Sequence, residues 1–284
     1  MANTIASRVY RDKYRASTLD TLLRGAMVTE AITSVDRSNN FRIQSPYSST
    51  PTVVVQALAG TYTPADFTTT DDTLTITDEF IVAEHIHDFQ ESLTQFDLFA
   101  ARTEQMAFNV AKKIDEFVLN NLCEDGTGTY TTPTGGFTTA ANINEIFANI
   151  NAKLDGYSDT YNGKFVVLEN SDMAGLYQAG AANGFSFADS VLNNGKVTSW
   201  MGVDVYVVRD STFTNATVGT ITWTNSGHRV AGVKNMATVG MPGGIKTEEK
   251  MVSGKTGMEV ATFGYIGFKL WAPKTALIID ITLA

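Results

Sequence analysis

The spacing of hydrophobic residues near the N-terminus predicts a short helix outside the main core. Residues 19–27 place apolar side chains at helical spacing, and Ser17 or Thr18 precedes them as a candidate N-cap. The rest of residues 1–40 is rich in charged residues, Ser, Thr and Asn. We therefore predict that residues 1–40 form an N-terminal arm.

The pattern then changes to that of β-strands. Residues rich in β-branched and aromatic side chains predict strands at 41–44, 52–58, 73–77 and 80–87. Residues 60–72 lie between them and are polar and rich in Thr. A polar connection of this length has little core to fold over. The sequence therefore predicts a long protruding hairpin with residues 60–72 at its tip.

Residues 94–122 carry the strongest helical pattern in the chain. Apolar or small residues recur there with a period of about 3.6 residues, and Lys, Arg and Glu occupy the remaining positions. Thr94 and Asp97 have the spacing of a capping box, and Gly126 follows the end of the pattern. We predict one helix about 42 Å long that crosses the molecule.

The second half of the chain mixes shorter helices and strands. Residues 126–141, rich in Gly and Thr, are the best candidate for a boundary between two lobes. Helices are predicted at 143–154 and 171–178, the second capped by Asn170. Strands are predicted at 164–168, 203–208, 218–224, 229–233, 244–246, 258–268 and 276–283. This arrangement predicts an α+β fold.

Composition adds a surface suited to contact with other protein. Hydrophobic residues make up 43% of the 284 residues and charged residues 18%, whereas charged residues are about 25% of an ordinary soluble protein. The net charge of -9 argues against tight wrapping of nucleic acid, which requires clustered Lys and Arg. The dense basic stretch of the N-terminal arm is either a scaffold- or DNA-binding segment or a solvated helix face. Its residues are Arg8, Arg11, Lys13 and Arg15.

Cysteine usage and hydropathy indicate a protein of a reducing cytoplasm. Cys123 is the one cysteine, which excludes an intrachain disulfide and a Cys-rich metal site. No apolar run approaches the roughly 18 residues that span a bilayer, and the N-terminal region lacks the apolar core of a signal peptide. We expect neither membrane insertion nor ordinary export.

Candidate chemistry is sparse. His85 and His87 fall on one face of a predicted strand, as two metal ligands or as a structural pair. Residues 253–256 read Ser-Gly-Lys-Thr, but Glu249 stands where a phosphate-binding loop requires Gly. Residues 184–188 miss a nucleophile elbow because Ala188 replaces its last Gly. The sequence therefore predicts neither an enzyme nor a metal or cofactor.

The order of the elements resembles the Hong Kong 97 fold of tailed-phage capsid proteins, and residues 267–279 resemble the closing segment of such chains. The resemblance implies an N-arm and an extended β-hairpin (the E-loop), followed by peripheral and axial domains with a long spine helix. The corresponding residues are 1–40 for the N-arm, 41–87 for the E-loop, 88–139 and 251–284 for the peripheral domain with its spine helix at 94–122, and 140–250 for the axial domain.

The resemblance also implies a function. We expect a major capsid subunit that self-assembles as hexamers and pentamers into an icosahedral head around double-stranded DNA, formed in the host cytoplasm and located in the virion. Expected partners are other copies of the chain, portal, scaffolding and decoration proteins, and loosely held DNA, with no membrane. Because no long prodomain precedes the arm, the scaffold is expected to be a separate protein or absent.

Two groups of residues are expected to contact other subunits. The hairpin tip supplies the first group, and a Pro-Gly turn supplies the second. These residues are Tyr62, Phe67, Thr69, Asp71 and Asp72 in the hairpin, and Met241, Pro242 and Gly243 in the turn.

Two alternatives remain open. An encapsulin-like protein nanocompartment shares the fold and would have the same order of elements. A small hydrolase or lectin-like binding protein fits the strands rich in Thr and Asn, but the long helix and the lack of a catalytic set oppose it.

Overall fold

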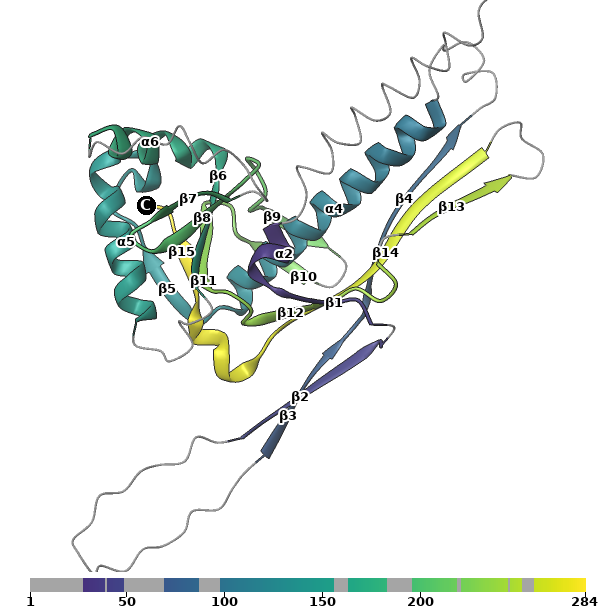
Figure 1. Cartoon of the computed structure of the whole chain (residues 1–284), viewed down its shortest axis with the longest axis horizontal. Helices are drawn as coiled ribbons and strands as arrows, with labels where there is room; N and C mark the ends of the chain where they lie inside the picture. Colours follow the sequence, from purple (N-terminus) through teal and green to yellow (C-terminus); the bar gives the residue numbers. More distant parts are fainter. Residues whose placement is uncertain are drawn as a thin grey trace, which may run out of the picture.

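The computed structural model describes residues 28–38, 40–48, 69–86, 98–155, 163–182, 196–218, 221–244, 246–251 and 258–284. Figure 1 shows a rounded lobe joined to a long extension, with a narrow hairpin projecting from their junction. None of the helices in this described part is long and apolar enough to span a membrane.

The predicted long helix is confirmed as α4 (Leu98–Asp125), which contains 28 residues. Its apolar stripe, including Val110, Ile114 and Phe117, is buried against the rest of the molecule. The helix ends where the Gly126 N–H donates to the Leu122 carbonyl, 3.1 Å away. The predicted cap at Thr94 and Asp97 lies outside the described residues.

Beside α4 lies a five-stranded sheet, which we call the long sheet (Figure 1). Its central strand pairs antiparallel with three neighbours, and α4 packs on one face of it. Val260 and Ile266 are an even number of residues apart and so point to the same face, where both are buried. The strands are β1 (Ser34–Asp36), β4 (Asp78–Ile86), β12 (Ala237–Gly240), β13 (Lys246–Met251) and the central β14 (Met258–Leu270).

The rounded lobe contains a six-stranded sheet, which we call the lobe sheet. Its strand order is β5-β15-β11-β6-β8-β7. The helices α5 (Ala140–Leu154) and α6 (Met173–Ala182) belong to this lobe (Figure 1). The strands are β5 (Gly128–Thr131), β6 (Lys164–Glu169), β7 (Lys196–Trp200), β8 (Val203–Val208), β11 (His228–Val233) and β15 (Ile278–Thr282).

Several predicted elements need correction. The Gly/Thr-rich segment contains β5, which pairs parallel with β15 and so belongs to the lobe sheet. The strand predicted at 218–224 is a hairpin of β9 (Asn215–Val218) and β10 (Ile221–Thr224). The strand predicted at 276–283 begins as the 3₁₀-helix η4 (Ala272–Leu277), because Pro273 occupies its first turn.

Two shorter segments also differ from the prediction. The strand predicted at 244–246 is β13, which begins at Lys246 and follows a turn with Gly243 and Gly244 at positive φ. Glu169, not Asn170, caps the 3₁₀-helix η3 (Asn170–Asp172) that leads into α6, because its carboxylate completes a capping box with Asp172. A second 3₁₀-helix, η1 (Gly136–Thr138), precedes α5.

The hairpin is present, but its strands differ from those predicted. Strand β2 (Arg42–Ser48) pairs antiparallel with β3 (Thr69–Thr75). Strand β4, predicted as part of the hairpin, pairs with β14 instead. Thr69, Asp71 and Asp72, predicted at the tip, are therefore strand residues. Both faces of a two-stranded ribbon are accessible to water. A segment rich in polar Thr and Asp residues can therefore form one of its strands.

The strand pairing crosses the predicted domain limits. Strand β12, within residues 140–250, pairs with β14 of the long sheet, and β15, within residues 251–284, pairs with β11 of the lobe sheet. The division into peripheral and axial domains at these residues stays a prediction.

Candidate assembly surfaces

The projecting hairpin is the first candidate assembly surface. Strands β2 and β3 form a separate two-stranded sheet in the described part of the chain (Figure 1). A two-stranded ribbon is only marginally stable by itself in water. Asp71 is exposed on this ribbon, whereas Leu74 near its base is 1% exposed. The outer part of the hairpin is therefore available for contact, and its base belongs to the body of the molecule.

Glycines in the long sheet let the base of the hairpin approach closely. A Cβ atom on Gly240 would lie 3.1 Å from side-chain atoms of Leu74 and Ile76. A Cβ atom on Gly267 would lie 2.9 Å from the Thr75 carbonyl oxygen. A larger residue at Gly267 would displace the strand, whereas one at Gly240 would require the Leu74 and Ile76 side chains to shift. We call Gly240 and Gly267 the glycine seat of the hairpin.

Asp72 faces its own chain. Its carboxylate accepts hydrogen bonds from Lys269 Nζ at 3.0 Å and from the Ala272 N–H at 3.1 Å, and its side chain is 14% exposed. Burial opposes its ionisation, but these hydrogen bonds, the Lys269 charge and the Thr73 N–H together lower the pKa of Asp72 below its ordinary value. The structure places Asp72 in contacts within the chain, and its contact with another subunit stays a prediction.

The second candidate surface is the face of the long sheet opposite α4. Ile81 on β4 is 61% exposed and lies opposite Phe263 on β14. The Tyr265 ring lies 6.2 Å from that of Phe263 and 5.9 Å from that of Phe41, which is 56% exposed. We call Phe41, Ile81, Phe263 and Tyr265 the outer strip. Phe41 and Ile81 are exposed, and Phe263 and Tyr265 are half-buried beside them. Exposed apolar groups that gather on one face are typical of a protein contact.

Sequence reasoning did not identify the outer strip. Ile81 and Val82 are adjacent in β4, so they point to opposite faces, and only Val82 packs in the interior beside Met106 and Val260. In a short run of apolar residues, the sequence does not show which residue is exposed and which is buried. The strip also joins three segments that are far apart in the sequence.

The Pro-Gly turn is confirmed as a turn. The Gly244 N–H donates to the Met241 carbonyl at 3.1 Å, and Gly243 and Gly244 have φ values of 73° and 64°. Met241 and Pro242 are buried, so Gly243 is the exposed residue of the predicted contact group. A contact with another subunit through this turn stays a prediction.

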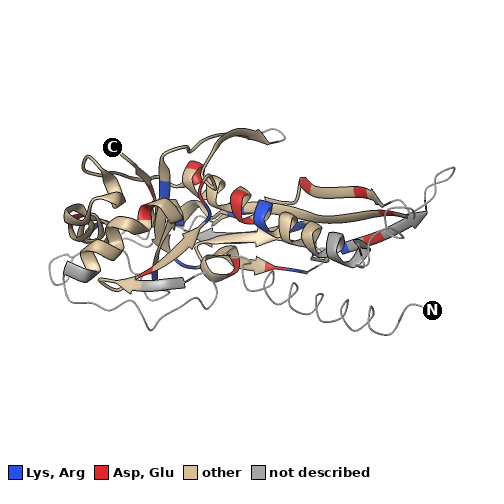
Figure 2. Ribbon diagram, turned by 90° about the horizontal axis from the view of Figure 1, so that it is seen from above, with Lys and Arg blue, Asp and Glu red and all other residues tan. Residues whose placement is uncertain are grey.

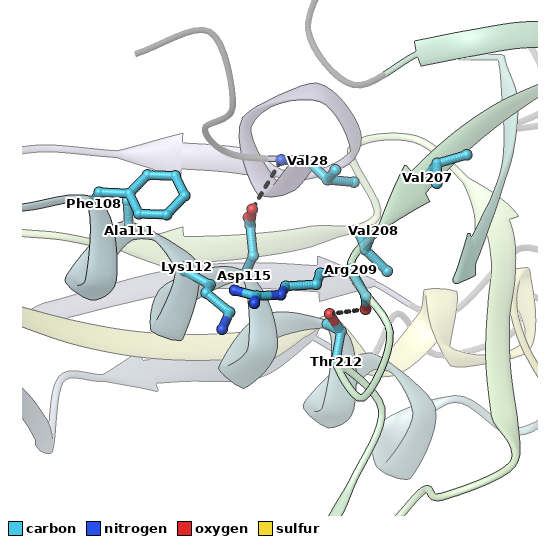
Figure 3. A pocket seen from close by; sticks show the side chains of 9 residues that line it. All are labelled: Val28, Phe108, Ala111, Lys112, Asp115, Val207, Val208, Arg209 and Thr212. Carbon is cyan, nitrogen blue, oxygen red and sulfur yellow. Dashed lines mark hydrogen bonds between the residues drawn. The ribbon is translucent and has the colours of Figure 1, made fainter. Parts of the chain in front are cut away.

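A cavity of about 130 Å³ lies where the N-terminal part of the described chain meets α4 (Figure 3). Here α2 (Val28–Ile32) is held by Asp115, which accepts hydrogen bonds from the backbone N–H groups of Val28 at 3.2 Å and Thr29 at 2.9 Å. The Thr29 hydroxyl donates to the same carboxylate at 2.5 Å. Lys112 and Arg209 also line this cavity. The cavity marks the place where α2 is anchored to the long helix.

The remaining predicted contact residues lie outside the described part of the chain. They are Tyr62 and Phe67 of the hairpin and Arg8, Arg11, Lys13 and Arg15 of the N-terminal arm.

The candidate chemical motifs do not converge in the described residues. His85 lies on β4 in the long sheet, whereas His228 lies in the lobe sheet, with its Nδ1 2.9 Å from Asp280. His87 and residues 184–188 and 253–256 lie outside the described part. Within that part, no three His, Cys, Asp or Glu side chains are grouped as metal ligands.

The buried charges of the lobe are paired with each other. Arg229 on β11 contacts Glu169 at 2.9 Å and Asp172 at 2.5 Å, and all three side chains are at most 10% exposed. Two carboxylates around one guanidinium hold η3 against the lobe sheet. Because these groups satisfy one another, we assign them to the folded structure and not to a reactive site. Figure 2 shows the Lys, Arg, Asp and Glu residues of the described part as short segments spread along a mostly uncharged ribbon.

Comparison with known proteins finds similarity in structure and not in sequence. No protein-family model and no curated protein matches the chain. The capsid structure of the cyanophage P-SCSP1u matches with a TM-score of 0.70 and 14% identity, covering 92% of this chain and 89% of that one. A structure of Mycobacterium phage Che8 matches with a TM-score of 0.66 and 16% identity, covering 85% and 84%.

A virus-like particle from Pyrococcus furiosus matches with a TM-score of 0.59 and 10% identity, covering 96% of this chain and 99% of that one. Similarity over nearly the whole length of each chain confirms the predicted α+β capsid fold.

Proposed function

We propose that this chain is the major capsid subunit of a tailed bacteriophage, with a structural and non-enzymatic role. Copies of the chain assemble as hexamers and pentamers into an icosahedral head around double-stranded DNA. The observation that carries the proposal is the shared fold, which covers 92% of this chain and 89% of the cyanophage capsid chain. Fold alone does not determine function, so the surfaces of the molecule supply the second part of the argument.

The hairpin and the outer strip supply the contact between copies. The hairpin of one subunit lies across the outer strip of its neighbour. Each surface lacks what the other provides, since the ribbon needs an apolar face to pack on and the strip exposes one. Many such contacts of modest strength add up to a stable shell.

The charge of the chain suits a container for DNA. With a net charge of -9, the subunit attracts phosphate groups weakly, so the DNA is held loosely and leaves readily. Portal, scaffolding and decoration proteins are the further partners in this proposal, and the head is assembled in the host cytoplasm.

A protein nanocompartment is the second candidate function. One observation favours it, the similarity to the virus-like particle from Pyrococcus furiosus. The TM-score is 0.59 for that particle and 0.70 for the cyanophage capsid, so we prefer the capsid. Particle diameter and nuclease-protected DNA in particles from infected cells distinguish the two.

The direct test is to purify the chain and examine it by negative-stain electron microscopy and light scattering. Shells or rings of capsomer size are expected, alone or with a co-expressed scaffolding protein. A monomer at high concentration in the presence of its scaffold contradicts the proposal.

A substitution in the outer strip tests the contact itself. We expect Ile81→Asp to abolish shells while the monomer remains folded, because an exposed side chain contributes little to folding but a buried charge at an interface is costly. Thr217→Asp, on the exposed face of the β9 strand, is the matched control and should assemble normally. Shells of normal yield from Ile81→Asp would show that the strip is not an interface.

A further inference from the structure

We propose that Asp72 is a positioning residue that latches the projecting hairpin to the junction between the two sheets. The inference concerns contacts within one chain and goes beyond the proposed assembly of copies. It assigns Asp72 a role different from that of its sequence neighbour Asp71.

The latch joins three segments of the chain. Asp72 belongs to β3 of the hairpin, Lys269 lies near the end of β14, and Ala272 is the first residue of η4. One carboxylate oxygen lies 3.0 Å from Lys269 Nζ, and the other accepts the Ala272 N–H at 3.1 Å. A carboxylate that uses both oxygens in this way has a defined orientation.

Lys269 and Ala272 stand on either side of the place where the chain leaves the long sheet. Strand β14 ends at Leu270, and η4 leads directly into β15 of the lobe sheet. Trp271 between them is also fixed, because its indole N–H donates to the Thr238 hydroxyl at 2.9 Å. The hairpin is therefore attached to the connection between the long sheet and the lobe sheet.

The glycine seat and the Asp72 contacts act together on the direction in which the hairpin points. Gly240 and Gly267 allow residues Leu74–Ile76 to sit directly on β12 and β14. Packing on this seat sets the distance between the strand and the sheet. The Asp72 contacts are made two residues farther along the strand from Leu74, so they hold the strand at a second point. Steric packing and the polar latch together determine the direction of the hairpin.

Asp71 and Asp72 are adjacent acids that have different surroundings. Successive residues of a strand point to opposite sides. Asp71 is exposed and lies opposite Pro46 in the hairpin, whereas Asp72 faces the junction. Asp71→Asn is therefore the matched control for Asp72→Asn, since both remove one charge from the same strand.

Hydrogen exchange on the full chain tests the latch. We expect Asp72→Asn to speed amide exchange in peptides covering residues 69–76 and 269–275 by about tenfold, since a hydrogen bond to a charged group is lost. Asp71→Asn should leave both peptides unchanged. Peptides from β6 and β11 report whether the lobe sheet remains folded in each variant.

Swapping the charges of Asp72 and Lys269 distinguishes loss of their ion pair from a general destabilisation of the chain. Asp72→Lys alone should speed exchange at least as much as Asp72→Asn. Adding Lys269→Asp should slow exchange again, because the ion pair is restored in the opposite sense. Equal exchange in Asp72→Asn, Asp71→Asn and the unmodified chain would overturn the latch, and so would a double variant no slower than Asp72→Lys.

The consequence for assembly rests on the proposed function. Shell yield is measured separately from amide hydrogen exchange, so the two results can differ. If the latch directs the hairpin toward a neighbour, Asp72→Asn should reduce shell yield at least about tenfold, whereas Thr217→Asp, outside the projecting hairpin, should retain shells. Faster exchange with normal shells would support the latch and contradict a role of hairpin direction in assembly. If Asp72→Asn loses its shells while its amide exchange stays as slow as in the unmodified chain, the latch is contradicted but the proposed capsid function is not.

Discussion

At the scale of single residues, Asn120 connects the long helix to the lobe. It is completely buried, and its side-chain amide donates to the carbonyl oxygens of Glu116 at 2.7 Å and Thr212 at 2.9 Å. Its side-chain oxygen accepts the Thr214 N–H at 3.2 Å, and Asn225 donates to it as well. One side chain therefore satisfies backbone groups on separate segments.

We expect Asn120→Ala to lower the free energy of unfolding by about 2–4 kcal/mol, because it leaves the buried Thr212 carbonyl and the partly buried Thr214 N–H without these partners. Asn109→Ala, at an exposed position of the same helix, should change it by less than about 0.5 kcal/mol. Urea unfolding followed by circular dichroism measures both. Equal effects of the two substitutions would show that the Asn120 contacts contribute nothing measurable.

The lowered pKa of Asp72 predicts acid sensitivity of the hairpin base. Because its pKa is lower in the folded chain than in the unfolded one, ionised Asp72 stabilises the fold above the unfolded value of about 3.9. That stabilisation is lost as the pH falls through the folded pKa. The stability difference between the unmodified chain and Asp72→Asn should therefore be largest near pH 6 and shrink progressively as the pH falls below about 3.9. A difference that is constant over this range contradicts the prediction.

At the scale of elements, the close approach of α6 to η1 depends on Gly175. A Cβ atom at this position would lie 2.1 Å from the Phe137 carbonyl oxygen and 2.7 Å from the Thr138 carbonyl carbon. Both are backbone atoms, so the contact cannot be relieved by rotating a side chain. Gly is ordinarily unfavourable inside a helix by about 1 kcal/mol relative to Ala, and here its lack of a side chain is required for packing.

We expect Gly175→Ala to destabilise the chain by about 1–3 kcal/mol despite the better helix propensity of Ala, because the helix must move away from η1. Ala174→Ser, an exposed position on the same helix, should be close to neutral. Thermal unfolding by calorimetry distinguishes the two. A more stable Gly175→Ala variant would mean that the helix moves without cost.

Prediction from sequence succeeded for elements with a long, regular pattern. Helix α4 was predicted because its buried stripe repeats over many turns, and α5 because Ile143, Ile146 and Ile150 share one face. The prediction for residues 218–224 was wrong, because Val218 pairs with Ile221 and this run of strand-forming residues is therefore divided between two antiparallel strands. Strand β3 was placed wrongly because its Thr and Asp residues resemble a loop.

At the scale of the whole molecule, the hairpin is a separable extension. Ser48 and Thr69 are partners at the described end of the ribbon, so an Asn-Gly turn can replace residues 49–68. We expect this shortened chain to fold with a melting temperature within about 5 °C of the original. It should not form shells, because the reach toward a neighbouring copy is lost.

The control for this deletion is Thr217→Asp, which retains the full hairpin and should assemble normally. Light scattering and negative-stain microscopy measure assembly, and circular dichroism measures folding. Normal particles from the shortened chain would show that the hairpin is not required for the shell.

The candidate assembly surfaces were only partly accessible to sequence reasoning. The polar hairpin was recognised from its composition, and Asp72 was selected as one of its residues. The partners of Asp72 were not predictable, since Ala272 is 200 residues away in sequence. The outer strip was missed because its members come from three separate segments and none is unusual within its own segment.

The sequence by itself determined the long helix, the presence of a hairpin, the order of the elements and the sparse charge. These properties depend on local periodicity and composition, which are read within short windows. Only the tertiary structure decided which strands pair, such as β5 with β15, and which side of each strand is exposed. Pairing and exposure depend on contacts between distant segments, and a shift of one residue in register reverses the exposed face of a strand.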